Sequence, residues 1–276
     1  MKKVNRVLTI LMFVFLYIPL VVLIIGSFNT GTNLTRFEGF TFQQYVRLFQ
    51  DRKLLGLLGN SMLISIVSTL VATVFGTLSA VGIHSLKPKL RKAVMSLTNI
   101  PMTNPEIVTG VSMALLFAFV GQMLKRQDVL GFATLLIAHI TFNLPYVILS
   151  VMPKLRQMDP SLTDAALDLG CRPVQAFFKV TIHEIMPGII SGAIMAFTMS
   201  LDDFVISYFV YGPSFVTLPV EIYNYTKKPL PPKIYALFTL VFFAILFLMI
   251  VMNIFQARDE KLRREHTGKR HRGGRA

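Results

Sequence analysis

The chain has 276 residues, of which 53% are hydrophobic, with 23 phenylalanines, no tryptophan and a mean hydropathy of +0.60. This apolar share exceeds that of an ordinary soluble domain and predicts an integral membrane protein. The net charge of +14 does not indicate a nucleic-acid-binding protein, because the charged residues lie at the ends of apolar runs and between them. The single cysteine, Cys171, excludes an internal disulfide and a cysteine-based metal site, and no metal site is expected.

Six apolar stretches are each long enough to cross a bilayer core about 30 Å thick as a helix, which takes roughly 20 residues. The first follows the basic start MKKVNR but is longer than the ~7–15 apolar residues of a cleaved signal peptide, so we expect a retained span. In the third, Pro105 and Gly110 predict a local irregularity of the helix. The fold class is therefore all-α integral membrane, with six transmembrane helices. In chain order the stretches are residues 7–28, 61–86, 100–123, 130–152, 187–211 and 234–256.

In the outer loop after the first stretch, Phe42, Tyr45, Val46 and Phe49 recur at helical spacing. This stripe predicts a short amphipathic helix. Its apolar face would lie either in the membrane interface or on neighbouring protein.

Basic residues sort onto alternate loops. Nineteen of the 28 lysines and arginines lie at the N-terminus, after the second and fourth stretches, and in the tail. Because basic residues accumulate on the cytoplasmic side, both termini are expected in the cytoplasm, as an even number of spans requires. Residues 1–257 would form the transmembrane domain, and residues 258–276 a basic cytoplasmic tail in contact with solvent or lipid.

The longest cytoplasmic loop, residues 153–186, has the pattern of two short helices. Asp159 and Pro160 form a good helix start, and Gly170 is a typical helix end. A second helical run follows Pro173. Taken alone, this pattern would also suit an amphipathic helix on the membrane surface.

Within this loop, DAALDLG followed by CRPVQAFFKVTIHEIMP resembles the EAA loop of ABC-importer permeases. That family has Glu-Ala-Ala, three residues, Gly, nine residues, Ile, one residue and Leu-Pro, and Asp164, Ala165, Ala166 and Gly170 follow its spacing. This chain departs from the pattern with Asp for Glu, Val for Ile, and Ile182-His183 for Leu-Pro. The last departure leaves the start of the fifth helix open.

The resemblance implies the type I, MetI-like importer permease fold, in which this loop forms coupling helices that dock on a separate ATPase dimer. Asp164, Ala165, Ala166, Gly170 and Arg172 would lie at that contact. ATP and Mg²⁺ would bind to the ATPase, and this chain would bind no cofactor. The sequence contains no G-x-x-x-x-G-K-[ST] phosphate loop, so it is not expected to be an enzyme on its own.

Asp202 and Asp203 are the only charged residues in the fifth stretch. An ionised carboxylate at bilayer depth costs at least ~2.5 kcal/mol and normally faces a bundle interior or a watery cavity. In a continuous helix Ser200, Asp203, Ser207 and Tyr211 would share one face, with Asp202 about 100° round from it.

Glu106 is the further acid, near the start of the third stretch, and no Lys or Arg lies within the spans to neutralise these acids. The countercharge would then be a cationic cargo, and Tyr208 and Tyr211 could contact its alkyl stem or ammonium groups. The alternative for each acid is a protonated carboxyl that is hydrogen-bonded to a neighbouring helix.

The run from SLDDFVISYFV to the outer loop, together with Asn60-Ser61 and PEIVTG at 105–110, resembles the spermidine/putrescine importer permeases. The resemblance covers most of the chain and implies polyamine import, with Asp202, Asp203 and Glu106 at the matching acidic positions. It also implies a bacterial inner-membrane location, a second homologous permease and a periplasmic binding protein.

Three alternatives stay open from the sequence. Permeases for ferric iron or thiamine share the EAA loop, so the cargo could be another cationic or small solute. A proton-coupled secondary transporter would need inverted repeats, which the sequence does not show. A scaffold protein would leave the intramembrane acids unexplained.

Overall fold

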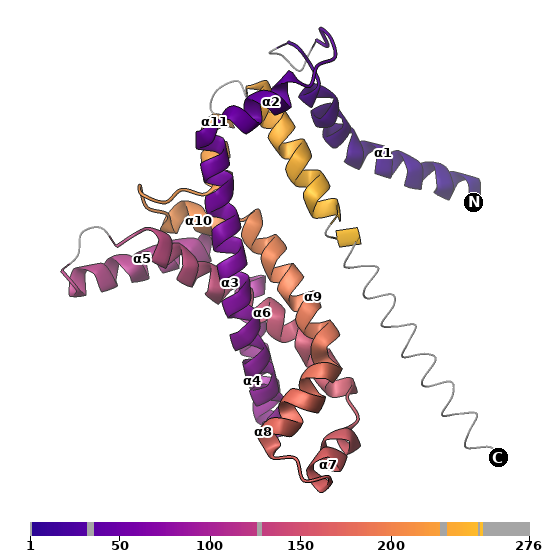
Figure 1. Cartoon of the computed structure of the whole chain (residues 1–276), viewed down its shortest axis with the longest axis vertical. Coiled ribbons are helices and arrows are strands. Elements are labelled where there is room, and N and C mark those ends of the chain that lie inside the picture. Colours follow the sequence, from indigo (N-terminus) through magenta and orange to yellow (C-terminus); the bar gives the residue numbers. More distant parts are fainter. Residues whose placement is uncertain (1, 32–35, 126–128, 227–230, 248, 251–276) are drawn as a thin grey trace. The chain divides into compact units, whose positions relative to one another are not determined.

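The computed structural model describes residues 2–31, 36–125, 129–226, 231–247 and 249–250, which form helices joined by turns (Figure 1). Five helices are long and apolar enough to cross a membrane, and the shorter apolar helix Pro232–Phe247 is the described part of the expected sixth. The predicted tail, 258–276, lies outside the described residues. The chain divides into two compact units, one of Met1–Leu58 and Ile222–Ile250, the other built around Gly59–Glu221.

The first unit contains α1 (Lys2–Ser27), α2 (Gln43–Gln50) and the helix Pro232–Phe247. The apolar window of α1 is not buried within the described chain, so it must meet lipid or another protein. The predicted short outer helix is confirmed as α2, where Phe42 and Phe49 keep their side chains exposed.

An ion pair joins two segments of this unit that are distant in the sequence. Lys233 Nζ lies 2.6 Å from Asp51 Oδ2, just before the start of α3 (Arg52–Ser85). The ammonium group donates a hydrogen bond to the Asp51 carboxylate and so lowers the pKa of that carboxyl below its ordinary value.

The second unit is built on close packing of α6 (Phe132–Gln157) against α9 (Ile182–Leu201) (Figure 1). Two glycines of α9 face α6. A Cβ atom at Gly188 would lie 2.9 Å from the Ser150 carbonyl oxygen, and one at Gly192 would lie 3.1 Å from Val147 Cα. Small residues at these positions let the two backbones approach closely, which is how helices pack in a membrane. The core at this contact includes Ala80 and Ile83 of α3, Val147, Val151 and Met152 of α6, and Ile185 and Ala196 of α9.

The second predicted span is longer than expected, because α3 is 34 residues long and already begins at Arg52. The third predicted span, 100–123, is wrong at its start. The structure has two helices there, α4 (Pro88–Thr103) and α5 (Glu106–Met123). Pro105 explains the break, because a proline disfavours the helical conformation of the residue before it, and Asn104 is extended with ψ 138°.

The fifth predicted span, 187–211, is wrong at both ends. The short helix α8 (Pro173–Ala176), one π turn (η1, Phe177–Thr181) and α9 run on into each other, so the spanning helix begins at Pro173. Pro187 lies inside α9 without ending it. At the other end α9 stops at Leu201, and a separate short helix, α10 (Val205–Val210), follows. Asp202 and Asp203 therefore lie in a helix break.

Candidate functional site

The side chain of Asp203 lies in the break between α9 and α10 and is hydrogen-bonded to the start of α10. Its Oδ1 accepts a hydrogen bond from the Ile206 amide at 3.2 Å, and its Oδ2 accepts from the Ser207 amide and hydroxyl, both at 2.8 Å. The first amides of a helix have no partner within the helix, so this carboxylate caps α10. Asp203 is 9% exposed, and its negative charge is thus stabilised by three donors inside the bundle.

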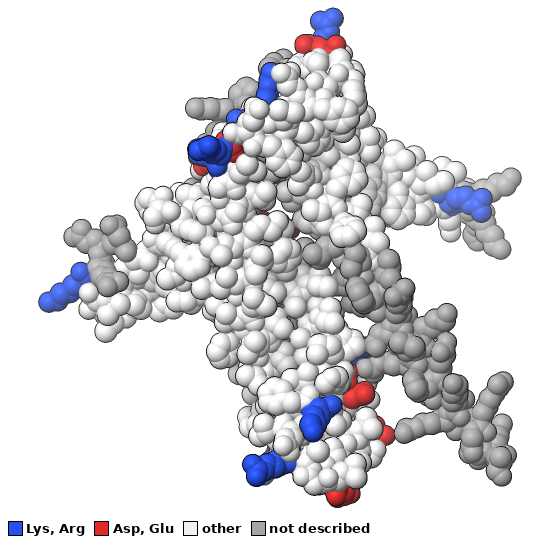
Figure 2. Space-filling model, viewed as in Figure 1, with Lys and Arg blue, Asp and Glu red and all other residues white. Residues whose placement is uncertain are grey.

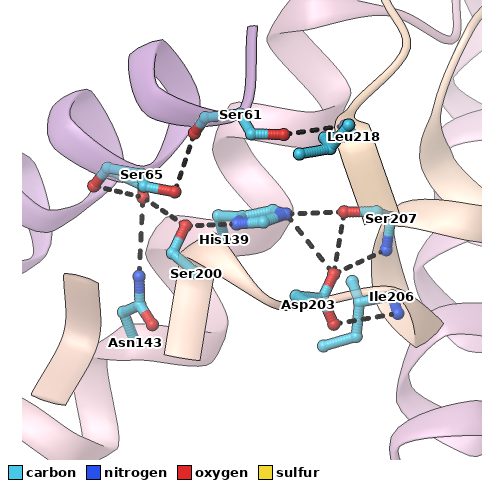
Figure 3. Close-up of polar contacts among 10 residues, drawn as sticks. Ser61, Ser65, His139, Asn143, Ser200, Asp203, Ile206, Ser207 and Leu218 are labelled. Carbon is cyan, nitrogen blue, oxygen red and sulfur yellow. Dashed lines mark hydrogen bonds and ion pairs between the residues drawn. The ribbon is translucent and has the colours of Figure 1, made fainter. Parts of the chain in front are cut away.

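A histidine of α6 bridges the two sides of this break. His139 Nε2 lies 2.9 Å from Ser207 Oγ and 3.5 Å from Asp203 Oδ2, and Nδ1 is hydrogen-bonded to Ser200 Oγ in the last turn of α9. His139 is 2% exposed, and Figure 3 shows its ring between Ser200 and Ser207. One imidazole ring therefore contacts the end of α9 and the start of α10.

The hydrogen bonds continue from Ser200 to α3 (Figure 3). Ser200 Oγ lies 3.0 Å from Ser68 Oγ, which also accepts a long hydrogen bond of 3.5 Å from Asn143 Nδ2 of α6. We call this set of buried side chains the polar network. Its members are Ser68, His139, Asn143, Ser200, Asp203 and Ser207.

Two of the predicted acids stand outside the polar network. Asp202 is exposed in the break and lies close enough to Asp203 and Glu106 to be repelled by their charges. Glu106 is exposed in the first turn of α5, where the helix dipole favours a negative group. Within the described residues, neither carboxylate is paired with a cation.

A glycine of α5 lets that helix approach α10. A Cβ atom at Gly110 would lie 2.8 Å from Phe209 Cδ2 and 3.4 Å from Ile206 Cα. Gly110 was predicted to mark an irregularity, but it lies within the regular helix α5 and serves packing instead. The close contact explains how Glu106 and Asp202, far apart in the sequence, come near each other.

The predicted tyrosines lie along α10 and its end. Tyr208 is 38% exposed, and its ring centroid lies 5.4 Å from that of Phe204 and 6.3 Å from that of Tyr211. The exposed ring of Tyr208 is of a kind that suits contact with alkyl stems or cationic groups.

The structure thus brings Ser200, Asp203 and Ser207 together, although the continuous helix that was expected to align them is absent. Sequence reasoning missed His139 and Asn143. The sequence contained a signal for both residues, because two polar side chains four residues apart in an apolar span lie on one helix face and need hydrogen-bond partners in the bundle.

The predicted coupling loop forms a helix, a glycine turn and a second helix. The first helix is α7 (Pro160–Asp168), which Asp159 caps by accepting from the Ser161 amide at 3.0 Å. Gly170 has φ +83°, its amide donates to Leu167 O, and the Cys171 amide donates to Ala166 O at 3.1 Å. This is the Schellman arrangement that favours glycine at a helix end. The predicted glycine turn is confirmed.

The loop presents a mixed apolar and charged surface. Leu169 is 86% exposed, Val174 66% and Phe178 59%, while Asp164, Ala165, Gly170 and Arg172 are also exposed and Ala166 is half-buried. Figure 2 shows Lys, Arg, Asp and Glu side chains gathered at the end of the second unit that carries α7 and α8, beside largely uncharged helix flanks. Exposed large apolar side chains rimmed by charge are typical of a protein interface.

Residues 72–264 match the family described as the binding-protein-dependent transport system inner membrane component, and the chain belongs to this family. It is therefore a multi-pass component of a transport system rather than an enzyme. The chain is 34% identical over 268 residues to the putrescine transport system permease protein PotI of Escherichia coli K12, covering 97% of this chain and 95% of PotI. It is also 34% identical over 248 residues to the spermidine/putrescine transport system permease protein PotC of the same strain, covering 90% and 91%.

Solved structures agree on the fold. A chain of a bacterial ABC transporter that imports the acidic polysaccharide alginate has a TM-score of 0.70 at 17% identity, covering 93% of this chain and 95% of that one. A chain of the inward-facing MetNI methionine ABC transporter has a TM-score of 0.60 at 17% identity, covering 72% and 93%. The predicted MetI-like importer permease fold is confirmed. These low identities show the fold alone, so the cargo has to be argued from the site and the sequence relatives.

Proposed function

We propose that this chain is a permease subunit of an ATP-driven importer of polyamines, putrescine or spermidine, and forms half of the translocation pathway. The observation that carries the proposal is the 34% identity to PotI and PotC along nearly the whole chain. The exposed carboxylates of Asp202 and Glu106, which no cation of the described residues pairs, supply the physical reason.

An exposed carboxylate at membrane depth cannot remain ionised against lipid without a large cost. Asp202 and Glu106 therefore face a watery pathway or a charged partner. A polyamine supplies positive charges separated by apolar methylene stems. The two carboxylates match the charges through ion pairs, and the rings of Tyr208 and Tyr211 on α10 and at its end match the stems and ammonium groups through cation–π contacts of about 0.5–2 kcal/mol each. Asp203, Ser200 and Ser207 shape the same region from within the bundle.

The exposed surface of the coupling loop docks on a separate ATPase dimer, which binds ATP and Mg²⁺. Asp164, Ala165, Ala166, Gly170 and Arg172 lie at or beside this contact. A second, homologous permease completes the pathway, and a periplasmic binding protein delivers the cargo. Both termini of this chain lie in the cytoplasm. ATP binding closes the ATPase dimer, and the coupling helix transmits that movement to α9 and α10, which gives alternating access.

The test is uptake by the complete complex, with both permeases, the ATPase and the binding protein, in proteoliposomes. Radiolabelled putrescine or spermidine should accumulate with ATP inside, and unlabelled polyamine should compete. Neutral 1,4-butanediol, which has the stem but no charge, should not compete. ATP-dependent import of thiamine or ferric iron in place of polyamine would overturn the cargo. Uptake driven by a proton gradient without ATP would overturn the importer class.

A further inference from the structure

Asp202 and Asp203 are neighbours in the sequence but lie in different surroundings. The side chain of Asp203 is 4% exposed and accepts three hydrogen bonds from α10. The side chain of Asp202 is exposed, and no hydrogen bond joins it to the side chain of another described residue. A carboxylate whose two oxygens both accept hydrogen bonds inside the bundle is poorly placed to bind a passing cation, whereas an exposed carboxylate is well placed.

The hydrogen bonds of Ser207 determine which nitrogen of His139 carries a proton. The Ser207 hydroxyl has a single proton, which it donates to Asp203 Oδ2 at 2.8 Å. His139 Nε2 lies 2.9 Å from the same hydroxyl oxygen, so Nε2 must be the donor in that contact. His139 thus donates into the Ser207–Asp203 pair and stabilises the negative charge of Asp203.

The other side of the imidazole ring fixes the end of α9. Nδ1 is hydrogen-bonded to Ser200, two residues before Asp202, while Nε2 contacts Ser207 in α10. Contacts on both sides of the break restrain the short segment between them. Asp202 is the first residue of that segment, with φ −101° and ψ 1°.

We propose that His139 is a positioning residue, which holds Asp203 and the break between α9 and α10 so that Asp202, and not Asp203, presents its carboxylate to the cargo. The identity of the cargo in this inference rests on the proposed function, but the positioning of Asp203 and of the break by His139 does not.

Two substitutions of His139 separate its two nitrogens. In His139→Gln the side-chain amide reaches the place of Nε2 and can still donate to Ser207. In His139→Asn the shorter amide reaches only the place of Nδ1, so the donor to the Ser207 hydroxyl is lost. The pair is matched in chemistry and differs in reach.

The experiment is carboxyl labelling of the complete complex in proteoliposomes with a water-soluble carbodiimide and glycinamide, with labelled sites located by peptide fragmentation. In the wild-type complex we expect Asp202 to be labelled about tenfold or more above Asp203. His139→Asn should raise labelling of Asp203 about tenfold, because the buried Ser207 hydroxyl, which donates to Asp203, loses the donor that it accepts from. His139→Gln should stay near the wild-type pattern. Labelling of Asp203 equal to that of Asp202 in the wild-type complex would overturn the proposal even if a variant fails to fold.

Uptake measurements on the same vesicles test the polyamine assignment separately from the positioning role of His139. His139→Gln should retain about ten times the putrescine uptake of His139→Asn, because only Gln restores the donor. Equal labelling and equal uptake in the two variants would overturn the role of His139. The expected labelling pattern without any putrescine uptake would instead support the positioning role and overturn the polyamine assignment.

Discussion

The substitution Asp203→Asn tests whether this carboxylate acts as a helix cap. Asn has one acceptor oxygen where Asp has two. If that oxygen takes the Oδ2 place it keeps both Ser207 donors, but the new NH₂ group then faces the Ile206 amide, which donates to Oδ1 at 3.2 Å. The opposite orientation loses both Ser207 bonds. The better orientation therefore still leaves one buried donor without an acceptor.

An unsatisfied buried donor costs about 1–3 kcal/mol. Since about 1.4 kcal/mol is a factor of ten, the start of α10 should open ~5- to ~150-fold more often. Removing a buried negative charge acts in the opposite direction, because it abolishes the cost of keeping that charge out of water. The three donors and the nearby His139 nitrogen already compensate that cost, so we expect the loss of the cap to dominate.

The assay is hydrogen exchange of the Ile206 and Ser207 amides, measured by mass spectrometry on the complex in nanodiscs. Exchange at these amides should speed up by the same ~5- to ~150-fold, and putrescine uptake should fall. Asp202→Asn is the matched control, because Asp202 caps no amide of α10, and it should leave this exchange unchanged. Unchanged or slower exchange in Asp203→Asn would mean that desolvation outweighs the hydrogen bonds and would refute the capping argument.

Three further predictions concern packing, coupling and pH. Gly188→Ala should lower the melting temperature of the complex, because the new Cβ meets a backbone oxygen of α6 at 2.9 Å and overpacking costs about 1–3 kcal/mol, whereas Gly82→Ala, which meets nothing within 4 Å, should not. A lower melting temperature for Gly82→Ala than for Gly188→Ala would contradict this packing. Gly170→Val should reduce ATP hydrolysis stimulated by the binding protein, because φ +83° is strained for a β-branched residue. Gly170→Asn should keep more of this ATP hydrolysis, because Asn tolerates the left-handed region better. Equal ATP hydrolysis in the two variants would count against the role of the glycine turn. Lys233→Met should destabilise the complex by at most ~1 kcal/mol at neutral pH, since the pair is partly exposed. Lys233 lowers the pKa of Asp51, so the ion pair stabilises the folded state above the ordinary Asp pKa of about 4, and this stabilisation is lost as pH falls through the lowered pKa of the folded state. The difference in thermal stability between wild type and Lys233→Met should therefore vanish at that low pH. A difference that stays constant with pH would argue against the ion pair.

The sequence by itself determined the class of protein, the number of apolar stretches and the helix and glycine turn within the loop of residues 153–186. These features depend on residues that are close together in the chain. Hydropathy over about 20 residues decides whether a helix can span a bilayer, and Pro105 and Gly170 act on the backbone within one turn. The structure accordingly contains the break at residue 105 and the glycine turn where the sequence predicted them.

Only the tertiary structure decided how the polar residues of the spans are satisfied. Apolar periodicity could not predict the break at Asp202, because the same sequence of residues is also compatible with an uninterrupted helix. The break is stabilised through Ser200, which contacts the His139 ring of α6, 61 residues away in the sequence, and the Ser68 hydroxyl of α3, 132 residues away. Such hydrogen bonds depend on which helices pack together, and glycines such as Gly192 set that packing through close backbone contact. The different surroundings of two adjacent aspartates follow from that packing, because burial and hydrogen-bond partners are properties of the assembled bundle.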